Sequence, residues 1–120
     1  MTTARELVLA NAARLEAAGI ETPVNDAELL MCHVLEISRG ELALAGAITA
    51  EQRATYDEYI ETRARRIPLQ HITGRAPFRH IEVSCGPGVL TPRPETELLV
   101  DAAIKHCQSI EAPHIVDLCA

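Results

Sequence analysis

Two segments carry the residue types and spacing from which chemistry could be built. One is the run Pro92–Glu97, which places an arginine, a threonine and two carboxylates between prolines. The other is Ile115–Leu118, an apolar stretch that contains Asp117. A buried strand that closes on an acidic residue before a glycine-rich turn is how Rossmann-type folds present a nucleotide site. The glycines would have to follow residue 120, so taken alone this segment is also compatible with an ordinary strand.

The cysteines and histidines do not predict a metal site. Cys32, Cys85, Cys107 and Cys119 form no C-x-x-C pair, and no histidine follows at zinc-finger spacing. Cys32 and His33 are adjacent, so their side chains would diverge on a helix. We expect buried reduced thiols, and we expect His33 and His71 to be structural histidines with satisfied hydrogen bonds.

Composition favours a helical protein without a nucleic-acid partner. Only three residues are aromatic while 48% are hydrophobic, so the core must come from Leu, Ile, Val and Ala. Eleven Lys and Arg against seventeen Asp and Glu give a net charge of −6, which disfavours phosphate-backbone binding. Arg63, Arg65 and Arg66 are explained more simply as helix-end cations than as a nucleic-acid patch. No signal peptide or membrane-spanning run is predicted, so we expect a cytoplasmic location.

The sequence of residues 1–66 predicts four helices, most of them with a capping signal at the start. Capping-box spacings occur at Thr3 with Glu6, Ser38 with Glu41 and Thr49 with Gln52. The first helix is expected to stop at Gly19, the second to start near Pro23–Asn25, the third to reach Leu42–Ala45, and the fourth to span Ala50–Arg66. The second helix is apolar on most sides, which predicts that it lies at the centre of a small bundle.

After Pro68 the character of the sequence changes. Glycines and prolines interrupt short apolar runs, which predicts a β-hairpin of Phe78–Ser84 against Gly88–Thr91. Pro94 is suited to the first turn of a further helix. Ile115–Leu118 is typical of a buried parallel strand.

The segments Pro68–Gly74 (PLQHITG) and Gly86–Val100 (GPGVLTPRPETELLV) closely resemble the linker and opening motif of the release-factor glutamine methyltransferases, also called HemK-like or PrmC-like. The resemblance is weak over residues 1–66, strong over 67–100 and returns at 115–118. Its most specific part is Pro92–Glu97. His71 stands where Tyr is common, Thr91 where Ile is common, and Cys119-Ala120 where the family has Gly-Thr.

The resemblance implies a mainly α fold that covers only the N-terminal portion of a family member. Residues 1–67 would be a helical release-factor-recognition domain, 68–91 a linker with a β-hairpin, and 92–120 the first helix and strand of a truncated Rossmann-like methyltransferase domain. The family uses S-adenosylmethionine to methylate a glutamine side-chain amide of peptide-chain release factors. The glycine-rich loop and the Asn-Pro-Pro-Tyr loop are absent from this sequence, so we expect the chain alone to be inactive and to bind no cofactor.

By the same resemblance, Leu90, Arg93, Thr96 and Asp117 are the candidate cofactor-binding residues, and none is catalytic. A structural alternative for the same run is that Glu95 and Thr96 cap the helix while Arg93 forms an ion pair that fixes the hairpin. The alternative for the whole chain is a non-enzymatic helical module that docks release factors or another protein.

Overall fold

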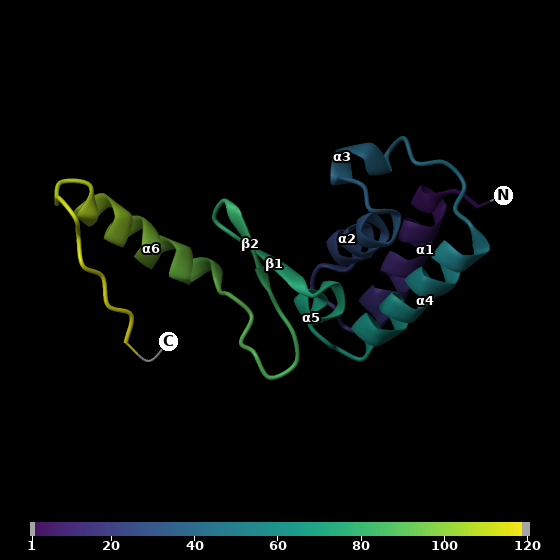
Figure 1. The fold of residues 1–120 in the computed structure, drawn as a ribbon. Coiled ribbons are helices and arrows are strands. Elements are labelled where there is room, and N and C mark those ends of the chain that lie inside the picture. The colour runs from purple at the N-terminus through teal and green to yellow at the C-terminus, as the bar shows by residue number, and fades with distance from the viewer. Residues whose placement is uncertain (1, 119–120) are drawn as a thin grey trace.

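The computed structural model describes residues 2–118, and these form an elongated molecule with extents of 60 × 29 × 22 Å. Figure 1 shows a helical bundle at one end, a β-hairpin in the middle and a single helix at the other end. The elements follow in the order α1 (Ala4–Ala17), α2 (Pro23–Leu35), α3 (Arg39–Leu42), α4 (Ala50–Ala64), α5 (Leu69–Thr73), β1 (Arg75–Phe78), β2 (Ile81–Ser84) and α6 (Pro94–Cys107). The mainly α fold class is therefore confirmed.

Reciprocal hydrogen bonds fix the starts of α1 and α4, as the capping signals predict. At α1, the Thr3 N–H donates to Glu6 Oε2 at 2.8 Å, and the Glu6 N–H donates to Thr3 Oγ1 at 3.3 Å. Thr49 and Gln52 make the equivalent pair at α4, at 2.9 and 3.1 Å. These bonds satisfy backbone donors that the first turn of a helix leaves free. Gly19 follows the α1 C-cap with φ +78°, a conformation that glycine adopts without strain.

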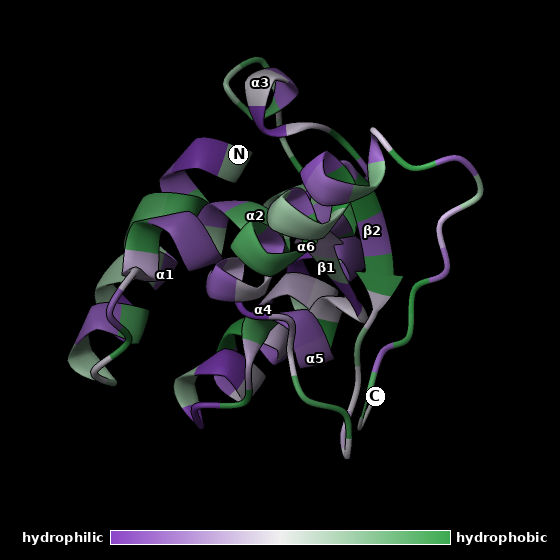
Figure 2. Cartoon of the chain, turned by 90° about the vertical axis from the view of Figure 1, so that its left-hand side faces the viewer, coloured by the Kyte–Doolittle hydropathy of each residue, from purple (hydrophilic) through white to green (hydrophobic). Residues whose placement is uncertain are grey.

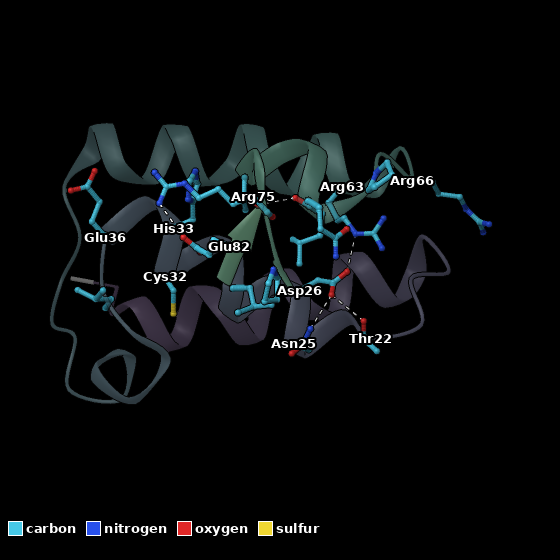
Figure 3. Close-up of a pocket in the computed structure, with 17 residues that line it drawn as sticks. Thr22, Asn25, Asp26, Cys32, His33, Glu36, Arg63, Arg66, Arg75 and Glu82 are labelled. Carbon is cyan, nitrogen blue, oxygen red and sulfur yellow. Dashed lines mark hydrogen bonds and ion pairs between the residues drawn. The ribbon is translucent and has the colours of Figure 1, made fainter. Parts of the chain in front are cut away.

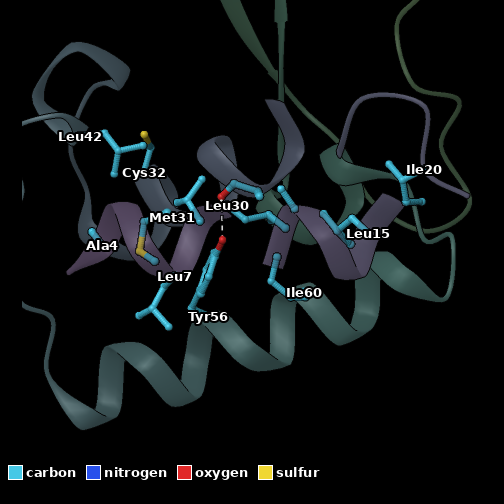
Figure 4. Close-up of a cluster of buried hydrophobic side chains, with 13 residues drawn as sticks. Ala4, Leu7, Leu15, Ile20, Leu30, Met31, Cys32, Leu42, Tyr56 and Ile60 are labelled. Atoms are coloured by element: carbon cyan, nitrogen blue, oxygen red, sulfur yellow. Dashed lines mark hydrogen bonds between the residues drawn. The ribbon is translucent and has the colours of Figure 1, made fainter. Parts of the chain in front are cut away.

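The hydrophobic core is centred on α2, which packs against α1, α3, α4 and α5. Leu30 and Met31 are fully buried between α1 and α4, together with Tyr56 and Ile60 from α4 (Figure 4). The Tyr56 hydroxyl donates to the Ala27 carbonyl oxygen at 3.1 Å, which satisfies the buried phenol. Burial also raises the pKa of Tyr56 well above its ordinary value, with a smaller contribution from nearby Asp57. The predicted central position of the second helix is confirmed.

The hairpin forms, but with a different register from the predicted one. Strand β1 pairs antiparallel with β2, with Arg75 opposite Ser84 and Phe78 opposite Ile81. The prediction that Gly88–Thr91 forms the second strand is wrong. The turn lies at Arg79 and His80, and Arg79 adopts a left-handed conformation with φ +52°. Turn chemistry favours glycine or asparagine for such a residue, so the sequence points to the Gly86–Gly88 segment instead.

Two further features differ from the sequence prediction. The short helix α5 was not predicted, because a proline at position 68 indicates the end of a helix. In the structure, Pro68 is also the N-cap of α5. The strand predicted at Ile115–Leu118 is not formed, and both of these end residues are exposed. A parallel strand needs a neighbouring strand to satisfy its backbone groups, and no described residues lie beside this segment as a strand. The prediction for Cys119-Ala120 concerns residues outside the described ones.

The C-terminal third of the described chain presents much apolar surface. Figure 2, which faces the α6 end, shows hydrophobic stretches on α6 and on the segment that follows it. None of the described α6 side chains is buried. Large exposed hydrophobic residues in this part are Val89, Leu90, Leu98, Leu99, Ile104, Ile110, Ile115, Val116 and Leu118. No helix within residues 2–118 has the length and apolar character that a membrane span requires.

Candidate functional site

A groove of about 1130 Å³ lies between the bundle and the hairpin (Figure 3). Its walls come from α2, the end of α4, α5 and the hairpin. The lining residues include Asn25, Asp26, Leu29, Cys32 and His33 from α2, Leu69, Gln70 and Thr73 from α5, and Arg75, Pro77 and Glu82 from the hairpin. The groove mixes polar, charged and apolar side chains, which suits a protein or peptide contact better than a bare apolar ligand.

Asp26 is the most deeply placed charge in this groove, with 5% of its side chain exposed. Arg63 Nε donates to Asp26 Oδ2 at 2.8 Å. Thr22 Oγ1 and Asn25 Nδ2 donate to the other oxygen, Oδ1, at 3.0 and 3.3 Å. A buried carboxylate is tolerated only when it is paired and hydrogen-bonded, and these three donors meet that requirement.

Arg63 joins three parts of the chain at one point. Besides its contact with Asp26 on α2, its Nη1 donates to the Ile67 carbonyl oxygen at 3.0 Å, in the turn between α4 and α5. The sequence correctly places Arg63 in the last turn of α4 but explains it only by the helix dipole. Its main partner is a carboxylate 37 residues earlier, and no local motif marks that carboxylate. This ion pair therefore sets how the groove wall formed by α5 sits against α2.

Cys32 and His33 are the thiol and imidazole groups that line the groove. Burial raises the pKa of the Cys32 thiol, with Glu28 adding to the effect, so the thiol stays protonated and unreactive at neutral pH. The His33 ring packs against Tyr59 with centroids 5.8 Å apart. His71 Nε2 is buried without a hydrogen-bond partner in the described structure, so the expectation that it is satisfied is wrong. Residues 2–118 contain no cluster of three potential metal ligands.

The four candidate cofactor-binding residues lie away from this groove, and all four are exposed. Leu90 belongs to the loop after the hairpin and is 79% exposed. Arg93 is the N-cap of α6, and its carbonyl oxygen accepts a hydrogen bond from the Thr96 N–H at 3.1 Å. Asp117 follows α6 near the end of the described chain. Neither the groove nor the smaller cavity beside α3 is lined by any of them, so their contact with a cofactor stays a prediction.

These residues, as the structure places them, do not enclose a site that fits S-adenosylmethionine. A cofactor pocket buries most of its ligand, whereas these four side chains come from separate exposed segments. The structural alternative predicted that Arg93 forms the ion pair that fixes the hairpin. In the structure, Arg79 on the hairpin forms the ion pair to α6.

Comparison with known proteins identifies the helical part of the chain. Residues 6–74 match the family described as "PrmC N-terminal domain", a stretch that covers more than half of the chain. The chain belongs to this family. The matched stretch begins in the first turn of α1 and ends at Gly74, so it contains the rest of α1, all of α2–α5 and the bundle side of the groove.

Full-length relatives extend the match beyond the bundle. The chain is 44% identical over 119 residues to the release factor glutamine methyltransferase of Mycolicibacterium smegmatis, which covers 99% of the chain and 42% of that relative. It is 46% identical over 108 residues to the protein of the same name from Streptomyces coelicolor, covering 88% of the chain and 38% of the relative. The chain thus spans about two fifths of the length of the curated relatives it matches.

Proposed function

We propose that these residues are the recognition and linker part of an enzyme that methylates a glutamine side-chain amide in peptide-chain release factors, with S-adenosylmethionine as the methyl donor. The observation that carries this proposal is the 44% identity to a release factor glutamine methyltransferase, which runs over nearly the whole chain and includes the Pro92–Glu97 run. We retain the division into 1–67, 68–91 and 92–120, and we propose a cytoplasmic location, where release factors act.

The bundle is suited to docking because it is structurally self-contained. All thirteen members of the buried core cluster lie between Ala4 and Ile60. The arrangement of thiol and imidazole groups in the groove supports binding and not bond cleavage. We propose that the bundle holds the release factor and that chemistry belongs to the methyltransferase domain, to which α6 would contribute.

A non-enzymatic docking module is the second candidate. It is favoured by the same observation, that the bundle has a buried core of its own. In both cases the bundle binds a protein partner. The two candidates differ in what α6 does, because a module without a methyltransferase domain would leave the exposed α6 face with no role.

Calorimetric titration of the purified 120-residue chain with a bacterial release factor tests the docking proposal. We expect one-to-one binding that Arg66→Glu weakens, because Arg66 lines the groove. Arg53→Glu is the matched control, since it makes the same charge change on α4 at a residue that does not line the groove. Absence of binding, or equal weakening by both variants, would contradict the proposal.

A parallel titration with S-adenosylmethionine tests the cofactor prediction. Because Leu90, Arg93, Thr96 and Asp117 are all exposed and line neither the groove nor the cavity beside α3, we expect no binding at micromolar concentration by this chain. Micromolar binding would show that the described residues build a site on their own. That result would leave the docking proposal intact.

A further inference from the structure

Arg79, at the tip of the hairpin, contacts two residues of α6. Its backbone N–H donates to Glu97 Oε1 at 2.8 Å. Its guanidinium Nη2 lies 2.6 Å from Asp101 Oδ1, and only 24% of the Arg79 side chain is exposed. Glu97 and Asp101 are four residues apart, so they lie on the same face of α6.

Little else holds α6 in place against the hairpin. No described side chain of α6 is buried, and Leu98 and Leu99 are each 71% exposed. Helices in globular proteins are normally fixed by burying an apolar face against another element. Since α6 lacks that packing here, its orientation depends on the connecting loop, residues 85–93, and on the contacts of Arg79.

The backbone of Arg79 supports a specific role for its side chain. With φ +52°, it occupies the left-handed region, which is unfavourable for a residue with a Cβ atom. Glycine or asparagine would suit the turn better but would lack the guanidinium group that reaches Asp101. The unfavourable turn is therefore combined with a contact to Asp101 that needs a long cationic side chain, besides the backbone contact to Glu97.

We propose that Arg79 is a positioning residue that fixes the orientation of α6 relative to the hairpin, and with it the Arg93–Thr96 segment at the start of α6. Contacts to two carboxylates separated by about 6 Å along the helix axis restrain both the direction of α6 and its rotation about that axis. The value of this orientation for methyl transfer rests on the proposed function, in which α6 contributes to the methyltransferase domain. The orientation itself does not depend on that function.

Residual dipolar couplings of backbone N–H groups in the full 120-residue chain test the proposal directly. In the parent chain, the couplings of α6 should fit the same alignment as those of β1 and β2. Arg79→Gly removes the guanidinium while keeping the backbone N–H and readily adopting a positive φ. In this variant, the α6 couplings should shrink and lose their agreement with the hairpin alignment. Arg79→Lys, which keeps a cation near Asp101, should retain part of the agreement.

Arg75→Ala is the matched control for orientation, because it removes an exposed ion pair with Glu82 on the same hairpin. It should leave the α6 couplings unchanged. Asp101→Asn removes the Arg79 ion pair from the α6 side and should reproduce the loss seen in Arg79→Gly. The couplings of α1, α2 and α4 in the same spectra report that the bundle stays folded.

Unchanged α6 couplings in Arg79→Gly would overturn the proposal, as would an equal loss in Arg75→Ala. Disagreement between α6 and the hairpin in the parent chain would overturn it as well. A failure of release-factor binding would contradict the proposed function but would not alter any of these couplings, so the two failures are distinguishable.

Discussion

Removing either partner of the Asp26–Arg63 ion pair should lower the free energy of unfolding, but the two losses should differ in size. Arg63→Met leaves the Asp26 carboxylate with 5% of its side chain exposed and only the Thr22 and Asn25 donors. Removing one partner of a buried pair costs about 3–5 kcal/mol. Because two neutral donors remain on Asp26, we expect the lower end of that range, about 3 kcal/mol.

Asp26→Asn should lower the free energy of unfolding less than Arg63→Met does. The Arg63 side chain is 17% exposed and keeps its hydrogen bond to the Ile67 carbonyl oxygen, so the stranded cation remains partly solvated. We expect a loss of about 1.5 kcal/mol, within the range for a hydrogen bond to a charged group. For a domain of this size each kcal/mol lowers Tm by roughly 4–8 °C, so Arg63→Met should lower it by roughly 12 °C or more.

Urea unfolding followed by circular dichroism measures both losses. Arg53→Met is the matched control, because Arg53 is also on α4 and pairs with Asp57 at 3.9 Å with both side chains about half exposed. It should change stability by no more than about 0.5 kcal/mol. A loss in Arg63→Met no larger than that in Arg53→Met, or smaller than that in Asp26→Asn, would contradict a buried Asp26–Arg63 ion pair.

Three further predictions concern the bundle. Tyr56→Phe removes a buried hydrogen bond and should cost about 1 kcal/mol in urea unfolding. Because burial raises the pKa of Tyr56 in the folded state, its contribution to the free energy of unfolding should persist below about pH 10 and be lost as the pH rises further. In thermal unfolding, Tyr56→Phe should therefore lose less stability over that pH range than the parent chain. Thr49→Ala should cost about 1 kcal/mol by removing the N-cap acceptor, whereas Thr62→Ala in the same helix should not destabilise α4 comparably. The Ser38 hydroxyl, followed by its backbone N–H, lowers the pKa of the Glu41 carboxyl, so carbon-detected titration of Ser38→Ala should show that pKa returning toward its ordinary value.

Local signals predicted the bundle because its helices are specified by neighbouring residues. Capping pairs three residues apart determined the starts of α1 and α4, and the apolar periodicity of α2 identified its central position. Pro94 marked the start of α6. The family resemblance rested on Pro92–Glu97 and Pro68–Gly74, and the comparisons confirm the family.

The features that escaped prediction depend on partners distant in the sequence. Asp26 belongs to no motif, so its pairing with Arg63 across 37 residues could not be inferred from either residue. The hairpin turn at Arg79 is stabilised by carboxylates on α6, whereas turn chemistry alone favoured the glycines at 86–88. Ile115–Leu118 has the composition of a parallel strand, but a strand forms only beside another strand.

In the proposed function, the bundle is the surface on which a release factor docks. Its most direct test is a titration of the isotope-labelled 120-residue chain with unlabelled release factor, followed by backbone amide chemical shifts. We predict saturable shifts at α2 and α5 around the groove, with Asn25 and Gln70 among them, and little change at the far end of α6. Saturable shifts confined to α6, or no shifts at all, would contradict the account.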